Sequence, residues 1–404
     1  MSSQCRQALV MIRANLCSLP RRLALSLSMV FSVALVVCVL AGFLSMAQGF
    51  ETALTTAGSP SVAVVLGAGA HQEPGSEVPA NAIRTLGATG DDIGAIRDGQ
   101  GRLVMSRELV VPVDLQPGGD ADDGVARTIA LRGMDATGPS LRAGITLSQG
   151  RPFSLGTHEI LVGDRMAAQW GLSVGDHLRL GTVEWTVAGR FSAKGSAFES
   201  EIWADLDAVQ AAFHRQGQVQ SLRLRLSGPP ALSLARLQAA LATITDTPLV
   251  AVSEADLYAA QSGHITGLIR LFGWPITLLM AIGAVAGALN TMMSSLSDRT
   301  VDIATVRALG FSRLSAFLAT WVEAVVLAGI GAGLGLLVSW LAFNGWQAST
   351  VGANHASMAF QLTVTRDVLF SAGWLGIAIG LLGGALPAVA AARSPIPAAL
   401  RARG

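Results

Sequence analysis

The chain has 404 residues, of which 51% are hydrophobic and only 14% are charged, and its formal net charge is +1. Soluble domains carry about 25% charged residues, so this composition argues against an ordinary soluble protein and indicates membrane spans beside a soluble region. The near-zero charge gives no reason to expect a nucleic-acid partner.

The chain opens with a basic segment and an apolar run. Residues 1–22 contain four arginines and no acid, and residues 23–47 contain no charge. About 20 apolar residues cross the hydrocarbon core as a helix, so 23–47 predicts a first transmembrane helix. Ser45-Met46-Ala47 also fits a signal-peptide cleavage site, but the run is about twice the usual length for a signal peptide, which favours the span.

Residues 48–262 have the patterns of a mixed α/β domain. Residues 176–191 alternate polar and apolar positions around Gly181-Thr182, which predicts a β-hairpin. Residues 221–228 alternate strictly, with leucines on one side, and predict a half-buried strand.

The rest of this region predicts an amphipathic helix, two loops and a long helix that leads from the domain into the second apolar run. Residues 231–244 space their leucines by three and four, which is typical of an amphipathic helix. Residues 67–80 and 114–124 are rich in glycine, proline and acids, and we expect mobile loops there. Ser253 is a candidate N-cap for a helix over 253–272 that continues into the second apolar run.

Three apolar runs follow the domain. Residues 271–297 and 369–392 contain no charge, and 314–343 contain only Glu323. Each is long enough to span. The predicted organisation is 1–22, cytoplasmic segment; 23–47, transmembrane helix 1; 48–262, extracytoplasmic α/β domain; 263–297, stalk and transmembrane helix 2; 298–313, cytoplasmic helix; 314–343, transmembrane helix 3; 344–368, external loop; 369–392, transmembrane helix 4; and 393–404, cytoplasmic tail.

Arginine placement sets the orientation. Residues 1–22 hold four arginines, while 298–313 and the tail after residue 392 hold three each, and the short segment 344–368 holds one. The positive-inside rule then predicts a multi-pass membrane protein with both termini and residues 298–313 in the cytoplasm and the α/β domain on the outside.

Catalytic and metal motifs are missing or stand in the wrong context. Residues 171–175, GLSVG, match G-x-S-x-G, but a helix-like segment precedes them and a strand follows, the reverse of a nucleophile elbow. The six histidines have no metal-ligand spacing, and the only lysine, Lys194, follows alanine where a Walker A motif needs glycine. We therefore expect no catalytic residue, no metal and no cofactor on this chain, and no ATPase activity without a partner.

The spans are rich in glycines at helical spacing, which allow helices to approach closely. The motif leaves open whether they pack the bundle internally or form a homodimer interface. The glycines are Gly283, Gly287, Gly329, Gly333, Gly376 and Gly380.

Glu323 is the only acid inside a predicted span, about 15 Å along the helix from Arg313. Such a group should face the bundle or a wet cavity. A structural anchor near the cytosolic leaflet is favoured over a substrate or proton path, because no second charged residue lies in any span.

Residues 298–313 form a compact two-signed segment between two spans. As a helix, it places Ile303, Val306 and Leu309 near one side and Asp298 and Asp302 near another. Gly310 is a candidate C-cap. A connector needs only a few residues, so this length favours a helix that docks on a partner.

The same segment resembles the conserved cytoplasmic loop of the FtsX/MacB-type ABC transporter permeases, whose pattern is E-R-x-x-E-I-G-x-x-R-A-L-G. It departs from that pattern by aspartate for both glutamates and by Ala304 for the first glycine. The matching residues are Asp298, Arg299, Asp302, Ile303, Arg307, Ala308, Leu309 and Gly310. The tail LPAVAAARSPIPAAL (386–400) and the segments RGMDA (132–136) and QGRPF (149–153) are also similar to the family.

The resemblance implies a homodimeric permease of the bacterial inner membrane, with residues 48–262 as a core domain in the periplasm. It would work with two copies of a separate ATPase subunit, which binds ATP and magnesium. Residues 298–310, with Val306, would form the coupling helix on that ATPase. Export of a small molecule, peptide or lipid-like substrate with a periplasmic adaptor and an outer-membrane channel is the leading expectation. Lipoprotein extraction, regulation of a cell-wall enzyme, and a non-transport scaffold or signalling role are alternatives.

Overall fold

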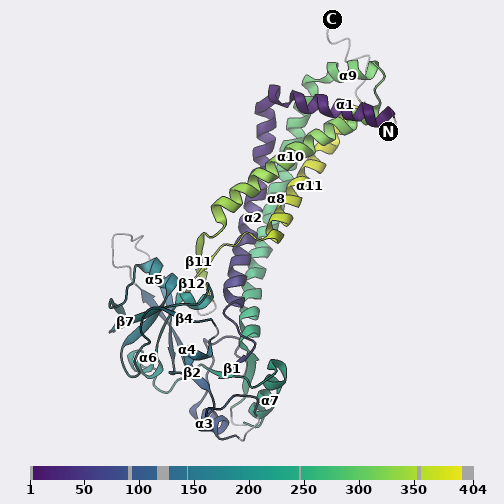
Figure 1. Cartoon of the computed structure of the whole chain (residues 1–404). Coiled ribbons are helices and arrows are strands. Elements are labelled where there is room, and N and C mark those ends of the chain that lie inside the picture. The colour runs from purple at the N-terminus through teal and green to yellow at the C-terminus, as the bar shows by residue number, and fades with distance from the viewer. Residues whose placement is uncertain are drawn as a thin grey trace. The chain divides into compact units, whose positions relative to one another are not determined.

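The computed structural model describes residues 3–89, 93–115, 127–142, 144–244, 247–352 and 356–393 (Figure 1). Their contacts divide the chain into two compact units. The helical unit takes the described residues of Met1–Gln48, Gly267–Trp346 and Leu362–Gly404, and the α/β unit takes those of Gly49–Thr266 and Gln347–Gln361.

Four helices in the described part of the chain are long and apolar enough to cross a membrane, and the protein is a multi-pass membrane protein. They are α2 (Leu23–Thr55), α8 (Glu254–Asp298), α10 (Arg313–Phe343) and α11 (Arg366–Arg393). Three shorter helices accompany them in the helical unit: α1 (Ser3–Ser18), η1 (Leu19–Arg22) and α9 (Thr300–Ala308). α2 continues beyond the predicted end of the first span, and α8 includes both the predicted stalk and the second span.

Small residues set the packing of the helical unit. A Cβ on Gly331 of α10 would lie 2.6 Å from the carbonyl oxygen of Val30 on α2, and one on Gly335 would lie 2.5 Å from that of Ala34. Because lipid gives apolar side chains no reason to leave it, such close backbone approach supplies much of the helix association in a membrane.

Ten strands of the described chain form one mixed sheet in the order β10-β1-β9-β2-β3-β8-β5-β7-β4, with β6 paired to β7. Most neighbours are antiparallel, but β3–β8 and β5–β7 are parallel. The strands are β1 (Val62–Gly67), β2 (Met105–Leu115), β3 (Arg127–Met134), β4 (Thr146–Gly150), β5 (Glu159–Gly163), β6 (His177–Leu180), β7 (Val183–Ser192), β8 (Glu201–Asp205), β9 (Ser221–Arg225) and β10 (Leu249–Ser253).

Short helices accompany this sheet, and two apolar cores lie between the elements. One core surrounds Trp185 and the other surrounds Leu222. The helices are α3 (Ala80–Ala88), α4 (Gly138–Leu141), α5 (Asp164–Trp170), η2 (Ala197–Ser200), α6 (Leu206–Ala212) and α7 (Pro230–Ala242).

Several local predictions are confirmed. β6 and β7 form the hairpin around Gly181-Thr182, and α7 is the amphipathic helix. The GLSVG segment follows α5 and precedes β6, so it is a helix-to-strand turn, with Gly171 in the left-handed region at φ 65°. The Ser253 hydroxyl accepts a bond from the backbone N–H of Asp256 (3.0 Å) and is the predicted N-cap.

One prediction needs correction, and two further ones concern the predicted loops. β9 is buried on both faces, because Ser221 and Arg223 are as inaccessible as the leucines between them. The predicted loop 67–80 contains a buried acid, Glu73, and ends at α3. The predicted loop 114–124 lies outside the described residues beyond Leu115.

The predicted external loop 344–368 contains a hairpin of β11 (Gln347–Val351) and β12 (Ser357–Gln361). This hairpin belongs to the α/β unit, although it lies between two helices of the helical unit in the sequence.

Candidate functional site

The segment between α8 and α10 is a short helix between two sharp junctions. α8 ends at Asp298, Arg299 leaves the helical conformation, and α9 begins at Thr300. At the other end Gly310 has φ 101°, and its N–H donates to the Arg307 carbonyl while the N–H of Phe311 donates to that of Val306. This is a Schellman ending, so the predicted C-cap role of Gly310 is confirmed.

α9 has an inward and an outward side. Ile303 is buried and Val306 half-buried, against a cluster that includes Met11 of α1 and Leu296 of α8. Asp298, Asp302 and Leu309 are exposed, Leu309 to 77%, and Arg307 is partly exposed. The predicted apolar side is therefore divided, because Leu309 points away from the cluster that Ile303 joins. The outward side carries two acids and one large apolar residue.

Arg299 turns inward and pairs with Glu323. Its Nη2 lies 2.6 and 2.7 Å from the two carboxylate oxygens of Glu323, and Asn15 of α1 donates to the same carboxylate at 3.2 Å. Arg299 is only 8% exposed and Glu323 only 2%. The side chain of Arg299 is thus not available to a partner, contrary to its grouping with the outward residues of the loop.

The partner of Glu323 comes from the junction between helices rather than from a span. Because Arg299 lies outside the predicted spans, the lack of a second charge inside the spans gave no indication of this ion pair. Arg22 of η1 and Arg299 both donate to the hydroxyl of Ser295, at 3.0 and 3.2 Å, so η1 and the end of α8 meet at the same place. This geometry agrees with the anchor interpretation of Glu323.

The first turn of α8 is also held by a buried ion pair. Arg223 of β9 donates through Nε to the carboxylate of Glu254 at 2.9 Å and through Nη2 to the hydroxyl of Tyr258 at 3.1 Å. The backbone N–H of Ser59, just beyond α2, donates to the other oxygen of Glu254 at 3.2 Å. The sheet, the end of α2 and the start of α8 are joined at this carboxylate.

Arg223 and Glu254 belong to a larger ionic cluster, in which every side chain is buried. Arg132 of β3 bonds Glu73 (3.0 Å), Glu108 of β2 (2.9 Å) and Glu201 of β8 (2.7 Å). Arg223 also bonds Glu73 and Glu108. The ionic cluster consists of Glu73, Glu108, Glu201, Glu254, Arg132, Arg142 and Arg223.

Opposite charges in this cluster lie within hydrogen-bonding distance, and they shift the pKa of several of its members. Burial raises the pKa of Glu73, but Arg132 and Arg223 outweigh burial and hold that pKa well below its ordinary value of 4.5. Burial lowers the pKa of Arg132, while Glu201 and Glu73 raise it further than burial lowers it. Glu73, Glu108, Arg132 and Arg223 each have a pKa shifted in the direction that favours the charged form, and the removal of one of them leaves its partners uncompensated.

Two family models match the chain in sequence. Residues 26–244 match the MacB-like periplasmic core domain, and residues 275–396 match the FtsX-like permease C-terminal domain. The chain belongs to the FtsX/MacB-type family of ABC transporter permeases.

A curated relative matches this permease-family chain with 24% identity over 306 residues. It is the macrolide export ATP-binding/permease protein MacB 1 of Aeromonas hydrophila subsp. hydrophila. The match covers 72% of this chain and 45% of the relative, so the chain spans less than half the length of that protein. The periplasmic region of MacB from Actinobacillus actinomycetemcomitans has a crystal structure similar to 50% of this chain and 92% of its own, with 11% identity and a TM-score of 0.38.

The predicted packing glycines of this permease-family chain fall into two groups. A Cβ on Gly376 or Gly380 of α11 would lie 2.7 or 2.3 Å from a Cβ of α10, so these two glycines pack the bundle. A Cβ on the other four would meet no described atom within 4 Å. They are Gly283 and Gly287 of α8 and Gly329 and Gly333 of α10.

Sequence reasoning missed the ionic cluster for a physical reason. Arg132, Glu108 and Arg223 each lie next to a leucine on a strand, and a charged residue beside an apolar one is typical of the solvent-facing half of an alternating pattern. Only the order of the strands brings their opposite charges together. The available signal was that charges of both signs occur on strands whose other face is apolar.

Proposed function

We propose that this chain is the membrane subunit of an ABC transporter. It couples ATP hydrolysis by an ATPase subunit to motion of the α/β domain. The outward side of α9, with Asp298, Asp302, Arg307 and Leu309, is the contact surface for the ATPase, which binds ATP and magnesium. Gly310 ends this helix, and Ile303, Val306 and Arg299 hold it against the helical unit.

One observation carries this proposal. α8 is a single helix of 45 residues, about 68 Å long at 1.5 Å per residue. It starts at Glu254, whose carboxylate bonds the sheet through Arg223, and it ends one residue before Arg299, whose guanidinium bonds Glu323. Force applied to α9 would therefore reach the α/β domain along a continuous helix.

The proposed topology follows from the arginine distribution. The α/β domain is inserted between the first and second spans and lies in the periplasm, while α9 and both termini lie in the cytoplasm. Two copies of the chain associate with two ATPase subunits. The glycines of α8 and α10 whose Cβ would meet no described atom of this chain within 4 Å support a second copy as their partner.

Export is the proposed direction, because a relative that matches most of this chain is named as a macrolide export protein. A small molecule, a peptide or a lipid-like compound is the proposed substrate class. Such a system needs a periplasmic adaptor and an outer-membrane channel as further partners.

The test is a pull-down of the tagged chain from native membranes in mild detergent, followed by mass spectrometry. A P-loop ATPase is expected with the wild-type chain, and it is expected to be lost with Arg307→Glu or Leu309→Glu on α9. Arg366→Glu, an exposed charge reversal at the start of α11, is the matched control and should retain the ATPase. If the wild-type chain brings down no ATPase in several detergents, the chain is a scaffold rather than a transporter subunit.

A further inference from the structure

The β11–β12 hairpin, Gln347–Gln361, connects α10 to α11 and is called the strap here. The segments that join the strap to α10 and to α11 are hydrogen-bonded to each other through their backbones. The N–H of Gly345 donates to the carbonyl of Leu362, and the N–H of Leu362 donates to that of Trp346, both at 2.9 Å. Movement of α10 or α11 therefore acts directly on the strap.

The strap is fastened to the α/β unit at Ala359 of β12. The hydroxyl of Ser200 donates to the Ala359 carbonyl at 3.1 Å and accepts from the Ala359 N–H at 3.0 Å. Arg165 of α5 donates to the same carbonyl through Nη1 at 3.2 Å. One backbone unit of the strap thus bonds two buried side chains from different elements of the domain.

The residues that hold Ala359 are themselves fixed. Arg165 lies 3.5 Å from the carboxylate of Glu199, which accepts backbone bonds from Ala193 (2.8 Å) and Gly195 (2.9 Å). Gly163 permits this arrangement, because a Cβ there would lie 2.3 Å from the carbonyl oxygen of Glu199. The attachment site is a rigid, buried platform and not a chance surface contact.

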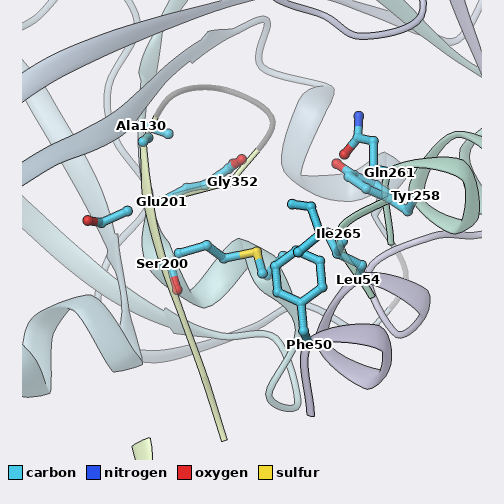
Figure 2. Close-up of a pocket in the computed structure, with 13 residues that line it drawn as sticks. Phe50, Leu54, Ala130, Ser200, Glu201, Tyr258, Gln261, Ile265 and Gly352 are labelled. Atoms are coloured by element: carbon cyan, nitrogen blue, oxygen red, sulfur yellow. The ribbon is translucent and has the colours of Figure 1, made fainter. Parts of the chain in front are cut away.

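Apolar contacts add to the attachment. Phe360 of the strap is fully buried and meets Phe50 of α2 edge to face, with ring centroids 5.6 Å apart. Ala356 is buried with Val110 and Ala130 of the sheet. A cavity of about 40 Å³ remains between Gly352 of the strap, α2, α8 and the sheet (Figure 2).

We propose that the strap is a further mechanical connection between the membrane helices and the α/β domain, in addition to α2 and α8, and is fastened by Ser200, Arg165 and Phe50. This proposal rests on the proposed coupling function. α8 connects the domain to α9, whereas the strap connects it to α10 and α11. α2 and α8 meet the domain at the same carboxylate, that of Glu254, so the domain could rotate about that point, and a separate attachment at Ala359 restricts this rotation. The domain then follows the whole helical bundle.

Docking of the strap is tested by hydrogen exchange on the full-length chain in detergent. Ser200→Ala removes both bonds between Ser200 and Ala359 and is expected to speed exchange in 356–361 about 10-fold. Phe360→Ala is expected to speed it about 100-fold or more, by deleting a fully buried ring. Ser349→Ala, an exposed serine on β11, is the matched control and should not change it. If neither Ser200→Ala nor Phe360→Ala speeds exchange, these contacts do not hold the strap and the proposal fails.

The coupling role is tested with the ATPase that co-purifies with the chain. Hydrogen exchange of the α/β unit is compared with and without ATP, magnesium and vanadate. We expect the wild-type chain and Ser349→Ala to show a nucleotide-dependent change that is at least three-fold smaller in Ser200→Ala and Phe360→Ala, with the ATPase still bound. If the variants undock the strap yet keep the full response, the strap is no connection. If the wild-type chain itself shows no response, the coupling function fails, and the docking result is unaffected.

Discussion

Replacement of Arg223 by methionine tests the ionic cluster most directly. Arg223 bonds Glu73, Glu108 and Glu254. Glu73 and Glu108 keep Arg132 as a partner after the change, but among the described residues Glu254 keeps only the N–H of Ser59. The loss therefore falls on one buried carboxylate at the first turn of α8. The removal of one partner of a buried ion pair costs about 3–5 kcal/mol.

A second replacement separates charge from packing. Glu254→Gln in the Arg223→Met background removes the unpaired charge and keeps the shape, so the double variant is expected to recover about 1–3 kcal/mol relative to Arg223→Met alone. Arg102→Met is the control, because Arg102 belongs to an exposed pair with Asp98. It should leave the sheet unchanged.

Hydrogen exchange of β9 and β2 peptides in the full-length chain measures the opening free energy without assuming two-state unfolding of a membrane protein. A cost of about 3–5 kcal/mol corresponds to a factor of about 150 to 5,000, so Arg223→Met is expected to speed exchange by that factor, with partial recovery in the double variant. The reasoning is refuted if Arg223→Met changes exchange less than about 3-fold. It is refuted equally if Glu254→Gln makes that variant worse, because the unpaired carboxylate would then not be the source of the cost.

Three further predictions follow from the same geometry. The pKa of Glu73 is lower in the folded protein than its ordinary value of 4.5. The ionised carboxylate therefore stabilises the fold above pH 4.5, and this contribution is lost as the pH falls toward the folded pKa. Glu73→Gln should therefore make hydrogen exchange in β9 less dependent on acid pH. Glu323→Gln leaves Arg299 buried without a charged partner, so exchange in α9 should rise while that in β9 stays unchanged. Gly380→Val should disrupt the bundle and lower the yield of folded protein in detergent, whereas Gly283→Val should not, because a Cβ at Gly283 meets no described atom within 4 Å.

The elements found from sequence are those whose signal is local. The β6–β7 hairpin needed only period-two alternation around a two-residue turn, and α7 needed only leucines spaced by three and four. Ser253 and Gly310 were predictable as caps because a cap is defined by its neighbours along the chain. Charge-free runs of sufficient length likewise predicted the apolar helices.

The elements missed depend on contacts between distant residues. The pattern placed Arg299 with the other charges of its loop, but 24 positions separate it from Glu323, the residue that turns it inward. The strap was predicted as a loop because its two strands are only five residues long each. Its partner Ser200 lies 159 positions from Ala359, and an ordinary serine gives no sign of such a contact.

Two buried ion pairs flank α8, one at Glu254 in its first turn and one at Arg299 just beyond its last residue, and their positions support the proposed transmission role over a purely stabilising one. Apolar contacts are non-directional, so a helix held only by them can slide or rotate at small cost. A carboxylate–guanidinium pair is directional and fixes both distance and orientation. Buried pairs add little net stability compared with apolar residues of the same size, so stability alone gives no reason to find one at each end of the helix. A helix can pass a rotation from one end to the other only if its orientation is fixed at both ends, and the ion pairs of Glu254 and Arg299 fix it there.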